Sequence, residues 1–300
     1  MKKYISLLLA ALMLLSLLAG CGGGKTNADD GDGTRTLVLR NTAGLSTNDP
    51  HATTNTHDYT VFENIYEGLY DLNEATGGYD LRLAEKVEAN DDATEYIVTL
   101  KQGVKFHNGE TMTADDVVFS YDHAQKDAHM GSYCRPLDHV EKIDEYTVKI
   151  VMNQPFSPIG HMLHKVKIMS KKGIEELGND FGKVPNKVGT GPYMWDENNY
   201  NPLSSWSAVA FEDYHRGKAQ IEKITWNVIE DDTSAITALQ NGELDYMVVP
   251  ISYWGDIKAS DKFNCVEKES NEVMLFCINV ESKTHGELLR NDNILSLIHI

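Results

Sequence analysis

Short runs of alternating hydrophobic and polar residues recur along the chain, and they predict β-strands. Alternation with a period of two is typical of a strand with one buried face. Two of these runs flank a polar turn at residues 144–146 and therefore predict a hairpin. The expected strands are residues 36–40, 96–100, 140–143, 147–152, 221–230 and 273–280.

Hydrophobic residues at helical spacing predict helices between these strands. The apolar residues between positions 62 and 69 fall at i, i+3, i+4 and i+7, which places them on one face of a helix. Residues 232–240 form a second candidate helix, which Asp-Thr at its start would cap and Gly242 would end.

Residues 104–121 combine three structural signals in one segment. Residues 104–107 alternate and predict a short strand, and an Asn-Gly pair at 108–109 predicts a turn. Thr113 lies three residues before Asp116, a spacing typical of a capping box at the start of a helix. The segment is therefore expected to fold as strand, turn and helix.

The N-terminal residues have the features of a signal peptide. Two lysines precede an apolar run at residues 4–19, and Gly20 and Cys21 follow it. The run is shorter than the roughly 20 apolar residues that a membrane-spanning helix needs. Leu-Ala-Gly-Cys at residues 18–21 resembles the lipobox of bacterial lipoproteins, and this resemblance implies lipidation of Cys21. An ordinary secretory peptide with an incidental cysteine is the alternative.

Composition and charge exclude some partners. The 300 residues are 41% hydrophobic and 24% charged, which are values of a folded globular protein. The formal net charge of -18 would repel the phosphate backbone of nucleic acids and the surface of anionic lipids. We therefore expect no nucleic-acid partner.

Three cysteines remain after Cys21. Cys265 and Cys277 lie in two apolar runs and would form a disulfide only if those runs are adjacent in space. Buried free thiols, Cys134 included, are the other interpretation.

Neither catalytic nor metal-binding chemistry is indicated by the sequence. His161 and His164 could face one way on a helix, but no third ligand lies nearby in sequence, and we expect both to face solvent. Asp115 and Asp116 are better explained by helix capping than by acid–base catalysis, and His107 by a structural role. We expect no enzyme activity and no cofactor.

Five segments in order resemble one family. They are Asp-Pro-His at residues 49–51, Tyr-Glu-Gly-Leu at 66–69, the segment 104–121, Val-Gly-Thr-Gly-Pro-Tyr at 188–193 and Gly-Glu-Leu-Asp at 242–245. Together they are similar to motifs of the extracytoplasmic solute-binding proteins of the peptide/nickel class, family 5, which serve ABC importers. Residues 211–217 keep only part of a further family motif.

The resemblance implies an α/β fold of the periplasmic-binding-protein type II kind, with hinge-linked mixed sheets in several lobes. After residue 293 the family pattern stops, so we expect a C-terminally truncated chain with most of a third lobe missing. The expected organisation is a signal peptide at residues 1–20, a flexible tether at 21–35, a first lobe at 36–58 and 187–275, a small second lobe at 59–186, and the start of the third lobe at 276–300.

Ligand-contacting residues are carried over from the resemblance alone. The segment after Asp-Pro-His would pass the cleft between the lobes, and a tyrosine of the small lobe would reach into it. The loop at residues 249–254 would lie on the same side. The implied ligand contacts are Thr54, Thr56, Tyr133, Tyr253 and Trp254.

The resemblance implies a function in solute uptake. The expected protein captures a solute outside the cytoplasm, namely an oligo- or dipeptide, and delivers it to the permease of an ABC importer. Lipid on Cys21 would anchor it to the cell membrane. A nickel or metal chelate and an oligosaccharide are alternative ligands, and an exported enzyme is an alternative of another class.

Overall fold

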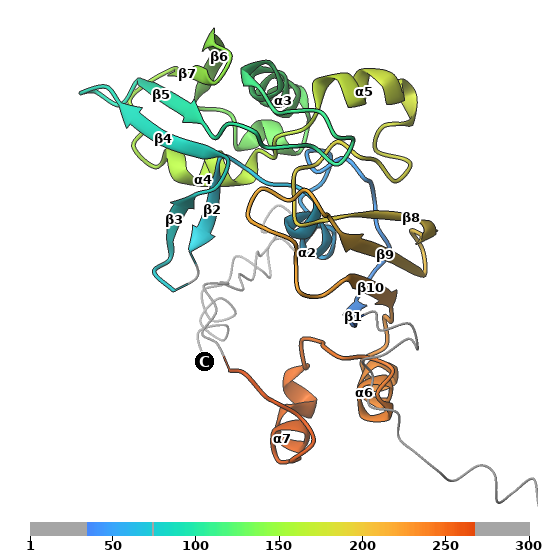
Figure 1. The fold of residues 1–300 in the computed structure, drawn as a ribbon. Coiled ribbons are helices and arrows are strands. Elements are labelled where there is room, and N and C mark those ends of the chain that lie inside the picture. Colours follow the sequence, from blue (N-terminus) through green and yellow to red (C-terminus); the bar gives the residue numbers. More distant parts are fainter. Residues whose placement is uncertain (1–34, 74, 268–300) are drawn as a thin grey trace, which may run out of the picture. The chain divides into compact units, whose positions relative to one another are not determined.

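The structure is a computed structural model that describes residues 35–267 except residue 74 (Figure 1). Contacts divide the chain into two compact units, residues 1–250 and residues 251–300, and each is described by itself. The α/β class is confirmed, because the first unit combines mixed and antiparallel sheets with several helices. Among the described residues, none of the helices has the length and apolar character needed to cross a membrane.

The first sheet is mixed and is assembled from distant parts of the chain. Its strand order is β1-β10-β9-β8. The first strand pairs with β10 in parallel, and the remaining pairs are antiparallel. The predictions of strands near residues 36–40 and 221–230 are confirmed. The strands are β1 (Thr36–Asn41), β8 (Tyr193–Asn201), β9 (Ser205–Ala210) and β10 (Lys223–Val228).

The second sheet is antiparallel and has the order β4-β5-β7-β6. The predicted hairpin is confirmed, since β6 pairs with β7 around the turn that follows residue 144. A separate two-stranded ribbon, β2-β3, precedes this sheet in the chain. The strands are β2 (Tyr70–Asn73), β3 (Gly78–Leu81), β4 (Ala84–Ala89), β5 (Glu95–Leu100), β6 (Leu137–Asp144) and β7 (Thr147–Met152).

Short helices lie between the strands along the chain, and α6 and α7 follow the last described strand. Helix α3 packs against β6 and β7 of the second sheet, as Figure 1 shows in green. Helix α2 packs against β8 of the first sheet. The helices are α2 (Thr56–Ile65), α3 (Ala114–Lys126), α4 (Ile159–Lys165), α5 (Lys171–Leu177), α6 (Asp232–Asn241) and α7 (Ile251–Lys258), with 3-10 turns η1 (Met130–Ser132) and η2 (Gly178–Asp180).

The core of the first sheet is rich in aromatic residues. Trp195, Trp206 and Trp226 come from three adjacent strands and are all buried. Phe62 and Tyr66, from α2 and its end, pack in the same cluster. Burying large apolar side chains contributes on the order of 2–3 kcal/mol each. Helix α2 thus belongs to the core of the first sheet, although the lobe boundary predicted at residue 59 falls within it.

The core of the second sheet lies beneath α3. Phe106, Val117 and Tyr121 are fully buried there, together with Val148 and Ile150 of β7. The predicted helix start is confirmed, because the backbone N–H of Thr113 donates to the carboxylate of Asp116 over 2.9 Å.

Two predicted elements are shorter than the pattern suggested. Residues 104–107 make only an isolated bridge, between Lys105 and Thr111, because the Asn-Gly turn reverses the chain before a ladder can form. Helix α2 ends at Ile65, so Tyr66 and Leu69 of the predicted helical face lie beyond it. A Cβ atom at Gly68 would lie 2.6 Å from two backbone carbonyl oxygens of α4, so the chain there runs extended against that helix.

The Val-Gly-Thr-Gly-Pro-Tyr segment presses against the end of α2. A Cβ atom at Gly189 would lie 2.3 Å from the carbonyl oxygen of Ile65, and one at Gly191 would lie 2.6 Å from that of Asn64. The Gly191 N–H also donates to the Ile65 carbonyl over 2.9 Å. Both glycines are needed here because the two backbones approach too closely for a side chain.

The predicted helix at residues 232–240 is confirmed, with one change at its start. Asp231 is the capping residue, and its carboxylate accepts from the Ser234 N–H over 2.8 Å. Gly242 ends the helix with a left-handed φ of 76°. The predictions for residues 1–34 and 273–280, including Cys21 and Cys277, lie outside the described residues.

Candidate functional site

The predicted contacts Thr54 and Thr56 lie at the entrance to α2. Asp58, which is fully buried, accepts hydrogen bonds from the Thr53 hydroxyl over 2.7 Å and from the Ser46 backbone N–H over 3.2 Å. These bonds fix the loop before the helix. Thr54 and Thr56 are left exposed, as residues that contact a solute would need to be.

Tyr59 lies one turn after Thr56 on the same face of α2 and is half-buried. Its hydroxyl donates to the Pro50 carbonyl over 3.3 Å. The ammonium of Lys165, the last residue of α4, lies over the Tyr59 ring, 4.4 Å from the ring centroid. Burial, followed by the charges of Glu63 and Tyr133, raises the pKa of Tyr59.

Tyr133 follows the turn η1 and is half-buried against the core of the second sheet. Its ring centroid lies 5.4 Å from that of His161 on α4. The Nδ1 atom of His161 lies 3.1 Å from the Tyr79 hydroxyl. The group Tyr59, Tyr133, His161 and Lys165 is called the tyrosine–lysine face below.

Tyr253 and Trp254 are not on a loop, as we predicted, but in helix α7. The helix forms because Ile257, one turn further on, is buried while its neighbours are exposed, and Pro250 ends the extended segment before it. The Lys258 ammonium lies 5.4 Å from the Trp254 ring centroid. This helix belongs to the second compact unit, whereas the tyrosine–lysine face belongs to the first.

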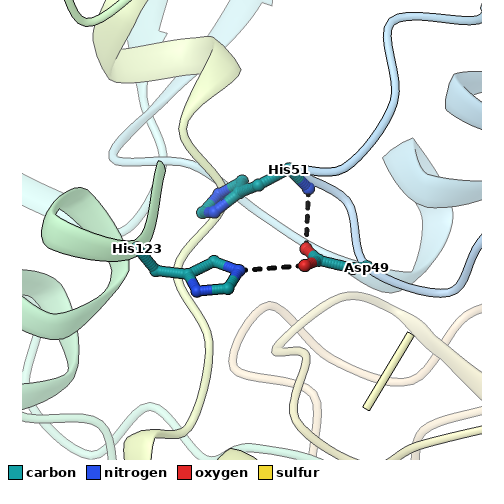
Figure 2. Close-up of side chains that lie close together, drawn as sticks. All are labelled: Asp49, His51 and His123. Atoms are coloured by element: carbon teal, nitrogen blue, oxygen red, sulfur yellow. Dashed lines mark hydrogen bonds and ion pairs between the residues drawn. The ribbon is translucent and has the colours of Figure 1, made fainter. Parts of the chain in front are cut away.

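The Asp-Pro-His segment forms a charged cluster with α3 (Figure 2). Figure 2 shows the Asp49 carboxylate between two partners: it accepts from the His51 backbone N–H and from His123 Nε2, both over 2.9 Å. His51 Nε2 accepts from the Lys167 backbone N–H over 3.1 Å. The cluster therefore ties three segments of the chain together.

The pKa values of the cluster follow from these contacts. Burial would raise the pKa of Asp49, but His123 and His51 outweigh it and hold that pKa below its ordinary value. The hydrogen bond to Asp49 raises the pKa of His123. Burial lowers the pKa of His51 to about 4. The contacts thus favour an ion pair between Asp49 and His123 beside a neutral His51.

Two groups of acidic and histidine side chains lie close enough together to hold a metal ion. The donor atoms of Asp49, His51 and His123 lie within 4.8 Å of one another. However, the Asp49 carboxylate and both Nε2 atoms are already used in the hydrogen bonds described above. The cluster is therefore better explained as an ion pair that links segments of the chain than as a metal site.

The second group is Glu63, Asp71 and His164, whose donor atoms also lie within 4.8 Å of one another. The ammonium of Lys167, only 1% exposed, lies 2.8 Å from the Glu63 carboxylate and would repel a cation. Burial would raise the pKa of Glu63, but Lys167 lowers it below the ordinary value. The prediction that His164 faces solvent is wrong. The short helix α4 buries that side against the core, and burial lowers the His164 pKa to about 4.

Glu67 connects three segments that the sequence motifs mark. Its carboxylate accepts from Tyr214 over 2.8 Å and lies 2.9 Å from His215 Nε2. It also accepts from the Thr190 hydroxyl over 3.1 Å and lies 3.5 Å from the Arg82 guanidinium. The sequence did not indicate that Glu67 bonds to several distant segments. The only signal was an acidic residue between apolar ones in the Tyr-Glu-Gly-Leu motif.

A polar cavity of about 60 Å³ lies beside this network, lined in part by Glu67, Arg82 and Lys167. This volume suits water molecules and is too small for a peptide. The exposed threonines and the tyrosine–lysine face remain candidates for solute contact in the first unit.

Comparison with solved structures defines the class of the fold. The chain superimposes on the binding protein MoaA of A. tumefaciens R10, solved with mannopinic acid, with a TM-score of 0.65 and 30% identity over 71% of this chain and 44% of that one. It also superimposes on the oligopeptide-binding protein AppA of Bacillus subtilis, which was solved with a nonapeptide. The TM-score is 0.69 and the identity is 25%, over 75% of this chain and 46% of that one. The fold is that of an extracytoplasmic solute-binding protein.

The sequence defines the family. Residues 79–294 match the model of the bacterial extracellular solute-binding proteins, family 5, and the chain belongs to this family. The glutathione-binding protein GsiB of Salmonella paratyphi A is 31% identical over 225 residues. That match covers 72% of this chain and 42% of the relative, so the chain spans less than half the length of this curated relative. The family groups binding proteins, not enzymes.

Proposed function

We propose that the protein captures a peptide outside the cytoplasm and delivers it to the permease of an ABC importer. The observation that carries the proposal is the family match over residues 79–294. Relatives and structural neighbours are named for binding glutathione, a nonapeptide and mannopinic acid. Glutathione and the nonapeptide are peptides, which favours a peptide ligand over a metal chelate or an oligosaccharide.

Peptide binding is expected to stabilise a full-length version of the protein, with all of its lobes, against unfolding. A ligand that binds only the folded state contributes about 2.7 kcal/mol at one hundred times its Kd. The measurement is thermal unfolding and calorimetric titration with di-, tri- and oligopeptides, with glutathione, nickel–histidine and an oligosaccharide as competing ligand classes. Mass spectrometry of the recovered peptide is the control for turnover. Cleaved peptide, or stabilisation by the chelate or sugar alone, would contradict the proposal.

We also propose that lipid on Cys21 anchors the protein to the cell membrane. The support is Leu-Ala-Gly-Cys at residues 18–21, directly after the apolar run of a signal peptide. In a bacterial host, radiolabelled palmitate is expected to enter the protein, and Cys21→Ala is expected to abolish incorporation. Cys265→Ala is the matched control and should keep the label. Label that persists in Cys21→Ala would refute the anchor.

A further inference from the structure

Lys165 carries an ammonium group without an anionic partner in the described part of the chain. None of the ion pairs or hydrogen bonds within residues 35–267 involves its Nζ atom, which instead lies 4.4 Å from the centroid of the Tyr59 ring. The charge of Glu63 acts to raise the pKa of Lys165, but the Glu63 carboxylate already lies 2.8 Å from the ammonium of Lys167. Two lysines thus share one acidic residue.

The surroundings of Lys165 make this unpaired charge unusual. The chain has a formal net charge of -18, and many of its exposed lysines lie within 4 Å of a carboxylate, as Lys126 does with Asp122. Lys165 is half-buried, and burial lowers its pKa. An ammonium that is partly removed from water and has no counter-ion is stabilised when an anion binds beside it.

The residues around Lys165 form a surface suited to an organic anion. Tyr59 and Tyr133 offer aromatic faces, and each is half-buried, so each keeps part of its ring accessible. Thr56 lies one turn before Tyr59 on the same face of α2 and is exposed. An ammonium that lies over a tyrosine ring fits a carboxylate attached to an apolar or amide-containing group.

We propose that the tyrosine–lysine face is a subsite for a carboxylate of the solute, with Lys165 as the residue that pairs with it. The inference rests on the proposed function and deepens it, since it selects ligands with a free carboxylate. A peptide would place its C-terminal carboxylate, or an acidic side chain, against the Lys165 ammonium. The Tyr59 and Tyr133 rings would pack against the adjoining part of the ligand.

The test compares two forms of one peptide. The peptide that binds the chain most tightly in the titrations above is prepared as the free acid and as the C-terminal amide. The acid is expected to bind roughly tenfold more tightly, because a charge-assisted hydrogen bond is lost in the amide. In Lys165→Met this preference should disappear while affinity for the amide is unchanged, and Lys165→Arg should retain it. Lys126→Met is the matched control and should behave as the unaltered chain.

A second measurement remains decisive if Lys165→Met does not fold. Lysines labelled by ¹³C-dimethylation are titrated by NMR with and without the free-acid peptide, and the Lys165 signal should shift to a higher pKa on binding. An acid preference that persists in Lys165→Met, or equal affinity for acid and amide with an unmoved Lys165 signal, would refute the subsite but leave peptide binding intact. Binding of neither form would refute the proposed function and the subsite with it.

Discussion

Replacing Gly191 with alanine is expected to lower the free energy of unfolding by about 2–4 kcal/mol. The new Cβ atom would lie 2.6 Å from the Asn64 carbonyl oxygen and from the Ile65 carbonyl carbon. These are backbone atoms at the end of α2, so they cannot move aside as the tip of a side chain would. Urea unfolding followed by circular dichroism measures the change.

A matched glycine substitution separates this steric effect from the general effect of alanine. Gly255 lies in α7, and a Cβ atom there would meet nothing within 4 Å. Gly255→Ala should therefore be neutral or stabilise the chain by up to about 1 kcal/mol, since alanine favours the helix. If Gly191→Ala changes stability by less than about 0.5 kcal/mol, the close approach of residue 191 to α2 is wrong.

Acidification from pH 6.5 to pH 4 is expected to destabilise the fold strongly. His51 and His107 are buried, and burial lowers the pKa of each to about 4. In the unfolded chain these histidines bind a proton near their ordinary pKa of 6.5, while in the folded chain they remain neutral until about pH 4. The unfolded state therefore binds more protons throughout this window, and stability falls as the pH falls.

The size of the effect follows from the two pKa values. One pKa unit corresponds to about 1.4 kcal/mol. Each histidine therefore lowers the free energy of unfolding by about 3 kcal/mol once the pH is below 4. The ion pair in Figure 2 does not oppose this. The raised pKa of His123 gives a contribution that is fully present below pH 6.5, and the lowered pKa of Asp49 gives one that is lost only at still lower pH.

The free energy of unfolding in urea, measured between pH 7.5 and 4.5, tests this expectation. His107→Gln should reduce the slope, because glutamine can still donate to the Gly191 carbonyl that His107 Nε2 contacts over 3.0 Å but does not titrate. His139→Gln, at an exposed position on β6, is the control for removing an imidazole outside the core. A stability that does not vary with pH in this window would show that the histidines are not buried as neutral groups.

The strands and the helix caps could be predicted because their signals are local. The alternation at residues 147–152 reports one buried face directly, and β7 buries Val148, Ile150 and Met152 on that face. The Thr113–Asp116 pair is likewise a contact between residues three apart. Such patterns depend only on the neighbouring chain.

The parts of the site that were missed depend on contacts between distant residues. Glu67 bonds to Tyr214 and His215, which are 147 and 148 residues away, so no local pattern records these bonds. The same limit explains His164, because a short helix with two histidines does not reveal which side faces the core. Lys165 could not be identified from the sequence for this reason either. Its significance comes from the Tyr59 ring, which another helix supplies.

The parallel pairing of β1 with β10 delays the completion of the first sheet during synthesis. Thr36 pairs with Lys223, and the bridge on the other side of β1 joins Leu39 to Tyr246, so both partners are made long after the strand itself. At 5–20 residues per second, a ribosome needs roughly 10–40 s to reach β10. Throughout that interval, β1 lacks the neighbours that it has in the folded protein. The hairpin β6-β7, by contrast, can close as soon as it is made, so the first sheet begins in the chain before the second but is completed after it.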